Sequence, residues 1–310
     1  MAGKAVARGR WYTLPPHRTG RAKTRPWRLN RPYPRGIVMR QEQNTRSRAG
    51  IVPFPGPLAM TGRALVSACQ SAGETLGLLA ATIANLRFLP TRARETIDQM
   101  YYYGVSSIAV NSIFALFSGM ILAFNSGLVL RELGMSQAIG SISAVAFCRE
   151  WGPIMTAIIL TARVGSSMTA EIGTMKISEE IDALEVMGVD PVQYLVLPRV
   201  AALALMTVAL TMISDFIGIV GSALVGYFQI NVHYRTFYNE AVLFLRFKDV
   251  VCGLVKAFVF GALIAVVSCS QGLRTTEGAR GVGRSTMYAV VSSLIFIIII
   301  DLLITKAFFM

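Results

Sequence analysis

From about residue 104 onward, long apolar runs alternate along the chain with shorter segments in which charged residues gather. A hydrocarbon core about 30 Å thick needs about 20 mostly apolar residues in a helix, which sets the length that a membrane-spanning run must reach. Five runs reach it, at residues 104–130, 138–165, 199–228, 250–270 and 286–309. A soluble helical protein would have to contain five such lengths by coincidence. We therefore predict an all-α integral membrane protein with about five transmembrane helices.

A further helix is expected ahead of the first span. Residues 60–89 are moderately apolar, with Arg63, Glu74 and Arg87 interspersed. That mixture suits a helix lying in the membrane interface better than one that crosses the hydrocarbon core. We predict an N-terminal interfacial helix at about residues 60–89.

The start of the chain differs in composition from the rest. The whole chain is 54% hydrophobic and only 15% charged, and its 30 Lys and Arg against 17 Asp and Glu give a formal charge of +13. Residues 1–50 hold 13 of the basic residues and one acid, so residues 51–310 are nearly neutral. Eight of the 12 prolines lie in residues 1–57, a segment that cannot bury enough surface to offset the entropy of ordering. We predict a disordered basic tail over residues 1–57 and a membrane domain over residues 58–310.

Three interpretations of this tail stay open. It fits an extension ahead of a functional start nearer Met39, an organelle transit peptide, or a basic arm that touches anionic lipid or nucleic acid. It is rich in Arg, as transit peptides are, but Ser47 is its only serine. Because no apolar stretch follows the early charges, a secretory signal peptide is excluded.

The orientation in the membrane follows from the basic residues near the spans, because cytoplasmic loops carry an excess of Lys and Arg. Such residues precede the first span, follow the second and follow the fourth: Arg63, Arg87, Arg92, Arg94, Lys176, Arg199, Arg274, Arg280 and Arg284. The loop after the third span disagrees, since it contains Arg235, Arg246 and Lys248. We predict that the N-terminus lies inside and the C-terminus outside.

The loop between the second and third spans, residues 165–199, is polar and has helical periodicity. Its apolar residues recur at spacings of four, three and three, namely Ile177, Ile181, Leu184 and Met187. Acidic residues fill the other positions, and Gly188 with Pro191 ends the pattern, while Ser178 could begin its second half. We predict an amphipathic cytoplasmic helix at about residues 168–188. It could pack on the rim of the bundle or dock a soluble partner.

Charged residues also occur inside the spans, where an ion needs a partner, a watery cavity or a polar ligand. Arg149 and Glu150 interrupt the second span, and Gly152 with Pro153 directly afterwards permits a break in the helix. Two interpretations are open: they border the path of a lipid headgroup near a dimer interface, or they pair with another span. Asp215 and Asp301 also lie within spans, and for them we favour structural bonds to Ser, Thr or Lys256.

The sequence offers little for catalysis or for a metal. The four cysteines show no CxxC spacing and mostly lie in apolar runs, which indicates small buried hydrophobes: Cys69, Cys148, Cys252 and Cys269. His17 and His233 lie in no catalytic constellation, so we expect no catalytic residue and no metal site. The alternatives to a permease are a membrane-embedded lipid-modifying enzyme that uses Arg149, Glu150 or Asp215, and an ion channel or secondary transporter. The latter would predict a filter-like loop or internal repeats.

One part of the chain resembles a known family. Residues 146–199 read AFCREWGPIMTAIILTARVGSSMTAEIGTMKISEEIDALEVMGVDPVQYLVLPR. This run resembles the MlaE/YrbE permeases, the membrane subunits of ABC transporters that work with mammalian-cell-entry (MCE) domain proteins. The matching pieces are RE-x-GP, AR-x-GS, AEIGTMK, E-x-IDAL, MGVDP and LPR. The similarity continues more loosely from about residue 60 to the C-terminus, including Asp301, and leaves the first 50 or so residues outside it.

This resemblance implies a non-catalytic lipid permease, with phospholipids as the expected cargo, in the bacterial inner membrane or, alternatively, the chloroplast inner envelope. Its implied partners are a second permease copy, a cytoplasmic ABC ATPase and an MCE-domain protein on the opposite face, with no nucleic acid. ATP would be bound by the partner, so we expect no cofactor in this chain, and the sequence has no G-x-x-x-x-G-K-[ST] phosphate loop. Carried over by position, the ATPase-coupling residues are Glu171, Ile172, Gly173, Lys176, Glu179, Glu180, Asp182 and Leu184.

Overall fold

The computed structural model describes residues 6–7, 10–11 and 73–310. The chain divides into two units, residues 1–60 and residues 61–310. In the first unit, strand β1 (Val6–Ala7) pairs antiparallel with strand β2 (Arg10–Trp11), with Val6 opposite Trp11. The rest of the tail expected at residues 1–57, and the first part of the interfacial helix expected at residues 60–89, lie outside the described residues.

Within residues 73–310, five helical segments are long and apolar enough to cross a membrane. They are Leu86–Glu132, Ser136–Ile177, Val192–Phe228, Phe247–Leu273 and Gly278–Phe309. Each contains one of the five runs chosen by length, so the expected all-α membrane architecture is confirmed.

Short 3₁₀ and π turns divide the first three segments. The first consists of η1 (Leu86–Arg92), α2 (Ala93–Met100), η2 (Tyr101–Val105) and α3 (Ser106–Glu132). The second consists of η3 (Ser136–Ala138), α4 (Ile139–Ala146), η4 (Phe147–Trp151), α5 (Gly152–Leu160), η5 (Thr161–Gly165) and α6 (Ser166–Ile177). After α7 (Glu180–Val186) come η6 (Val192–Val196), α8 (Leu197–Phe228), α9 (Tyr234–Phe244), α10 (Phe247–Leu273) and α11 (Gly278–Phe309). Of the η turns, η1 and η3 are 3₁₀ and the other four are π.

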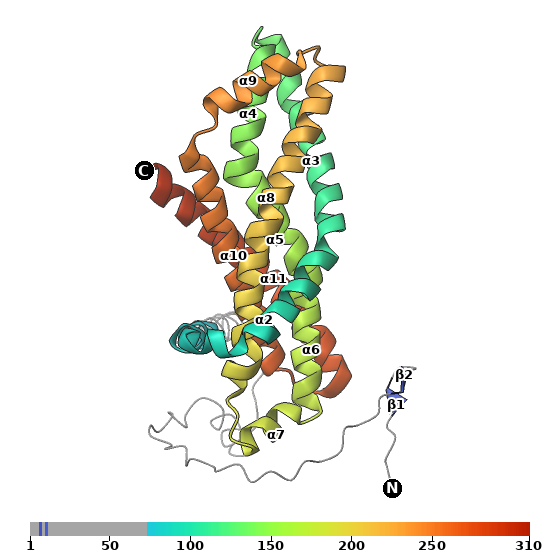
Figure 1. Ribbon diagram of the computed structural model, residues 1–310, viewed down its shortest axis with the longest axis vertical. Helices are drawn as coiled ribbons and strands as arrows, with labels where there is room; N and C mark the ends of the chain where they lie inside the picture. Colours follow the sequence, from blue (N-terminus) through green and yellow to red (C-terminus); the bar gives the residue numbers. More distant parts are fainter. Residues whose placement is uncertain (1–5, 8–9, 12–72) are drawn as a thin grey trace, which may run out of the picture. The chain divides into compact units, whose positions relative to one another are not determined.

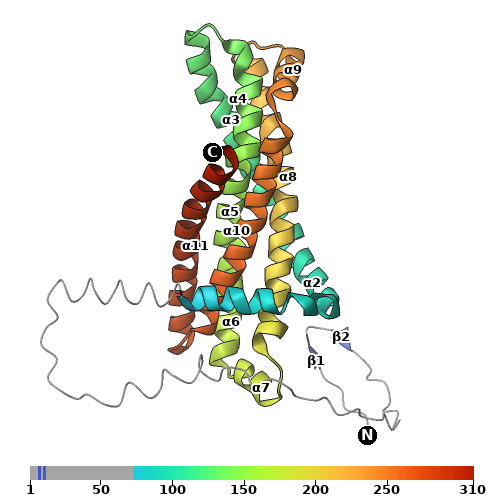
Figure 2. The ribbon, with the colours of Figure 1, turned by 90° about the vertical axis from the view of Figure 1, so that its left-hand side faces the viewer.

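The helix Gly73–Ala84 lies within the segment expected as an interfacial helix at residues 60–89, but it ends earlier than expected, because η1 begins at Leu86. It runs crosswise to the long helices, as Figure 2 shows in cyan. Glu74 forms an ion pair with Arg274, and the hydroxyls of Thr75 and Ser270 are 3.2 Å apart. This helix is therefore attached to the C-terminal end of α10, in the crosswise orientation that an interfacial helix needs.

The middle of the bundle is built on close contact between α3 and α8. The backbone of Gly119 lies directly against that of Gly218, and the Ser222 hydroxyl donates a 3.0 Å hydrogen bond to the Gly119 carbonyl. A Cβ at Gly221 would meet the carbonyl of Leu116. Small residues permit such close approach between helices in a membrane. The small residues of α8 therefore serve close helix packing.

The two ends of the bundle carry different elements (Figure 1). Helices α6 and α7 and the α10–α11 connection gather at one end, whereas α9 and the α3–α4 turn lie at the other. The connections that the basic residues assign to the cytoplasm therefore share one end, as a single orientation requires. Helix α9 was not expected, since its residues were taken for an outer loop. Three cysteines, Cys148, Cys252 and Cys269, are buried free thiols, as expected, and Cys69 lies outside the described residues.

Candidate functional site

Charged residues from three elements meet inside the bundle. Arg149 and Glu150 lie on η4, Asp249 and Lys256 on α10, and Asp301 on α11. We call these five residues the intramembrane charge cluster. Helices α10 and α11 lie side by side, as both ribbon views show (Figures 1 and 2). Pairing with other spans, one of the two interpretations made from the sequence, is observed here.

One half of the cluster is centred on Asp249. Its Oδ1 accepts hydrogen bonds from Arg149 Nη2 at 2.6 Å and Nε at 3.1 Å. Its Oδ2 accepts the backbone N–H of Arg246 at 3.2 Å, at the N-terminus of α10. Both carboxylate oxygens of this buried residue therefore have donors, which is what a buried charge requires.

The other half is centred on Lys256, whose side chain is completely buried. Its Nζ lies 2.5 Å from Glu150 Oε2 and 2.8 Å from Asp301 Oδ1. The Thr305 hydroxyl also donates to Glu150 Oε1 at 3.1 Å. The bond expected between Asp301 and Lys256 is confirmed, and Lys256 bridges the second, fourth and fifth spans.

A π turn explains how two adjacent residues both reach this cluster. In a regular α-helix, neighbouring side chains point about 100° apart. Arg149 and Glu150 lie in η4, where the backbone N–H of Gly152 bonds to the carbonyl of Phe147. The helix thus does not break at Gly152 and Pro153, as the sequence permitted. It widens by one residue just before them, a feature often found at functional sites.

Exposure separates the members of the cluster that a ligand could reach. The side chains of Arg149 and Glu150 are 34% and 30% exposed, whereas those of Asp249 and Lys256 are 2% and 0% exposed. The guanidinium of Arg149 also lies 3.9 Å from the centre of the Phe309 ring, in the last turn of α11. Arg149 and Glu150 therefore form the accessible edge, and Asp249 and Lys256 hold that edge in place.

Asp215, which the sequence also singled out, lies apart from this cluster. It is on α8, 8% exposed, and its Oδ1 has no hydrogen-bond partner among residues 73–310. That oxygen lies where a Cβ atom would be if Gly152 on α5 were any other residue. The structural bond to Ser, Thr or Lys256 that we favoured is not observed at this atom.

The segment expected as one coupling helix differs from that expectation in two ways. Helix α6 continues the second span without a break to Ile177, and α7 begins only at Glu180. Between them Glu179 takes a left-handed backbone conformation, with φ of 61°, and the Ser178 hydroxyl bonds back to the Thr174 carbonyl rather than capping α7. Of the expected apolar face, Ile181 is buried in the core and Leu184 packs against it, whereas Ile177 and Met187 are exposed.

The eight residues implied for ATPase coupling are distributed between the surface and the core. Ile172 is buried, and a Cβ at the buried Gly173 would meet Thr275. Glu171 pairs with Arg199 at 3.1 Å, and Lys176 pairs with Asp182 at 2.6 Å. Among the eight, the acids Glu179, Glu180 and Asp182 lie on or beside α7 and are exposed. We call these three the acidic end surface.

The sequence interpretation did not single out Asp249. Asp249 and Lys256 are seven residues apart on α10, so they lie on the same helix face two turns apart. Thr305 likewise follows Asp301 by one turn on α11. These spacings could have indicated that the residues share a helix face, whereas only the structure shows how far each side chain is buried.

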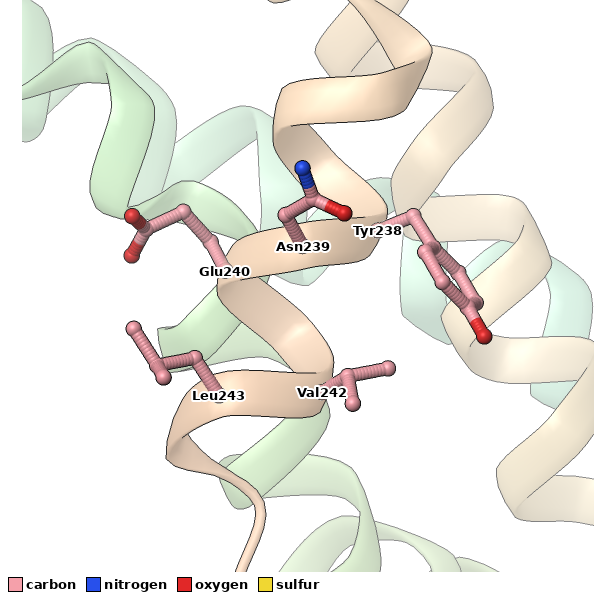
Figure 3. A pocket seen from close by; sticks show the side chains of 5 residues that line it. All are labelled: Tyr238, Asn239, Glu240, Val242 and Leu243. Carbon is pink, nitrogen blue, oxygen red and sulfur yellow. The ribbon is translucent and has the colours of Figure 1, made fainter.

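A hollow lies on the surface of α9. It has a volume of about 310 Å³ and is lined by Tyr238, Asn239, Glu240, Val242 and Leu243. Figure 3 shows that these side chains spread outward from a single helix and do not converge on one point. It is an open surface depression and brings no charged constellation together.

Comparison with known proteins gives consistent matches. The family model described as permease MlaE matches residues 96–307. A probable ABC transporter permease protein of Rickettsia conorii is 36% identical over 248 residues, which cover 80% of this chain and 96% of that protein. A probable ABC transporter permease protein of Synechocystis is 40% identical over 206 residues, covering 66% of this chain and 78% of that protein. The Arabidopsis thaliana protein TRIGALACTOSYLDIACYLGLYCEROL 1, chloroplastic, is 39% identical over 216 residues, which cover 70% of this chain and 62% of that protein.

Proposed function

The chain belongs to the MlaE permease family, and we propose that it is the membrane subunit of an ABC-type transporter of phospholipids. In this proposal two copies of the chain pair, two cytoplasmic ATPase subunits drive them, and an MCE-domain protein on the opposite face exchanges lipid with them. ATP is bound by the ATPase, so this chain needs no cofactor of its own. The membrane is the bacterial inner membrane or the chloroplast inner envelope.

The observation that carries the proposal is the accessible edge of the intramembrane charge cluster. Arg149 is one-third exposed and is oriented by the buried Asp249. A guanidinium forms strong charge-assisted hydrogen bonds with phosphate oxygens. A cation fixed at this depth beside apolar helices suits a ligand with a charged head and apolar chains. The Arabidopsis relative, which is named after a galactolipid, supports a lipid as cargo.

The outer helices leave room for both lipid and a second copy. In the most apolar stretch of the fourth span, 56% of the residues are buried inside the bundle. The corresponding share is 28% in the first span and 17% in the fifth. Helix α10 is therefore the centre of the bundle, and α3 and α11 present apolar faces outward. Such faces in a membrane contact lipid tails or another protein.

The proposed mechanism needs a motor outside this chain. ATP binding by the ATPase pair draws the two acidic end surfaces together, and the spans above them open or close a lipid-sized cavity between the two copies. Every member of the charge cluster is engaged in an ion pair. That arrangement favours positioning and binding over general acid–base chemistry.

Mass spectrometry of lipid and protein isolated together with the intact chain tests this function. The proposal expects bound phospholipid, an ATP-hydrolysing subunit and an MCE-domain protein in one complex. Isolation of the folded chain with none of the three would contradict it.

Neutralising the Arg149–Asp249 pair should separate lipid binding from folding. The double variant Arg149→Gln/Asp249→Asn removes both charges and so leaves neither buried alone. We expect a folded complex whose lipid transport falls roughly tenfold or more, because a hydrogen bond to a charged group is worth roughly 1.5 to 3 kcal/mol. Transport is measured in vesicles and folding by thermal melting. Unchanged transport by the neutral pair would show that Arg149 is structural only.

A further inference from the structure

A second charged pair lies between the bundle core and its cytoplasmic end. Arg199 is in the first turn of α8 and is 7% exposed, and its Nη2 donates to Glu171 Oε2 on α6 at 3.1 Å. The Glu171 side chain is half exposed. The pair therefore joins a residue at the surface of α6 to the buried start of the third span.

Arg199 is held on one side only. Its second terminal nitrogen, Nη1, is buried and has no hydrogen-bond partner in the part of the chain that the structure describes. Leaving a buried donor of a charged group unpaired is costly. A fully structural guanidinium would be expected to have its donors satisfied, so one partner on one side indicates a second position for this group.

Tyr103 offers that second position. It lies on η2, is 1% exposed, and its hydroxyl is likewise buried without a partner among residues 73–310. Tyr103 belongs to the same buried core cluster as Val196 and Val200, which flank Arg199 along the chain, and η2 packs against α8. A phenol oxygen can accept an N–H of a guanidinium. Arg199 thus has an acidic partner near the surface, while a neutral buried hydroxyl lies on an element that packs against its helix.

The position of Glu171 connects this pair to the acidic end surface. Glu171 and Lys176 lie on the same helix, α6, and Lys176 pairs with Asp182 at 2.6 Å. A displacement of α7 would therefore act on α6 through the Lys176–Asp182 pair, and α6 would act on α8 through the Glu171–Arg199 pair. Helix α8 in turn packs against α3, α5 and α10, so its displacement would move most of the bundle.

We propose that Arg199 is a positioning residue that transmits movement of the acidic end surface to α8 by exchanging Glu171 for Tyr103. This inference rests on the proposed function, since it needs an ATPase to move that surface. It adds that Arg199 binds Glu171 in one conformation of the transporter and Tyr103 in the other.

The test measures lipid transported per ATP hydrolysed in vesicles that contain the full complex. Arg199→Gln should lower this ratio roughly tenfold, within the usual range of coupling between sites. Arg199→Lys, which keeps the charge but loses the planar fork, should retain an intermediate ratio. The exchanged pair Arg199→Glu/Glu171→Arg should recover most of it. Glu95→Gln, in the exposed Arg92–Glu95 pair of α2, is the matched control and should leave the ratio unchanged.

A purely structural role for Arg199 predicts a different outcome. Transport and hydrolysis would then fall together with the amount of folded complex, and the ratio would stay constant, which would overturn the proposal. If the exchanged pair does not fold, an Arg199→Lys ratio no better than that of Arg199→Gln overturns it instead. Failure of the proposed function is distinguishable, because the unaltered complex would then show no ATP-dependent transport at all.

Discussion

Replacing Lys256 with Met is expected to abolish folding of the membrane domain. Lys256 is fully buried and is bound to both Glu150 and Asp301. Removing it leaves two carboxylates together in a medium where an unpaired charge is expensive. Breaking a buried ion pair costs about 3 to 5 kcal/mol, against a total stability of about 5 to 15 kcal/mol for a typical protein. Size-exclusion profiles and thermal melting in detergent measure this loss.

Two control variants make the Lys256 result specific. Lys248→Met removes an exposed cation from the same helix and should leave the melting temperature nearly unchanged. The triple variant Lys256→Met/Glu150→Gln/Asp301→Asn removes the uncompensated charges and should recover a monodisperse protein. If Lys256→Met alone melts like the unaltered chain, Lys256 does not hold the three spans together.

Reversing the acidic end surface is expected to abolish transport without unfolding the chain. Glu179, Glu180 and Asp182 are exposed, and Asp182 alone has an ion pair among the described residues, with Lys176. Because surface charges contribute little to stability, the triple change to Lys should leave the melting temperature within a few degrees. Like charges facing a partner cost several kcal/mol, so we expect the ATPase to detach or its hydrolysis to be uncoupled. ATPase recovered with the chain and lipid transport are measured on the same sample.

The opposite end of the bundle supplies the matched control for this reversal. Glu132→Lys, at the end of α3, and Glu240→Lys, on α9, change charge at the end away from α7. They should leave ATPase binding intact. The acidic end surface is not where the ATPase couples if charge reversal at both ends lowers ATPase binding and transport equally. The same conclusion follows if reversal at neither end lowers them.

The membrane architecture could be read from the sequence because run length alone decides it. Each span contains about 20 consecutive residues that water solvates poorly, and this constraint does not depend on tertiary contacts. The ends of the helices were less readable. The second span was expected to end near residue 165, where its apolar run ends, but its helix continues to Ile177 as α6, which packs against α10 and α11.

Only part of the candidate site could be predicted from the sequence. Arg149 and Glu150 are visible as charges within an apolar run, so the sequence marks them. Their partners could not be chosen without tertiary contacts, because Asp249 is 100 residues away from Arg149 along the chain. Ile172 and Gly173 were placed on the coupling surface by family position, and only the packing of α6 against α10 shows that they face the core.

Transport by the reconstituted chain, with and without its ATPase, tests the central claim that this chain is a passive path driven by a separate motor. Purified chain is placed in vesicles that contain a fluorescent phospholipid, and transfer is followed with the co-isolated ATPase and ATP, with a non-hydrolysable ATP analogue, and with no partner. The account predicts sustained transfer only with the ATPase and hydrolysable ATP. Equal transfer by the chain alone, without nucleotide, would contradict it.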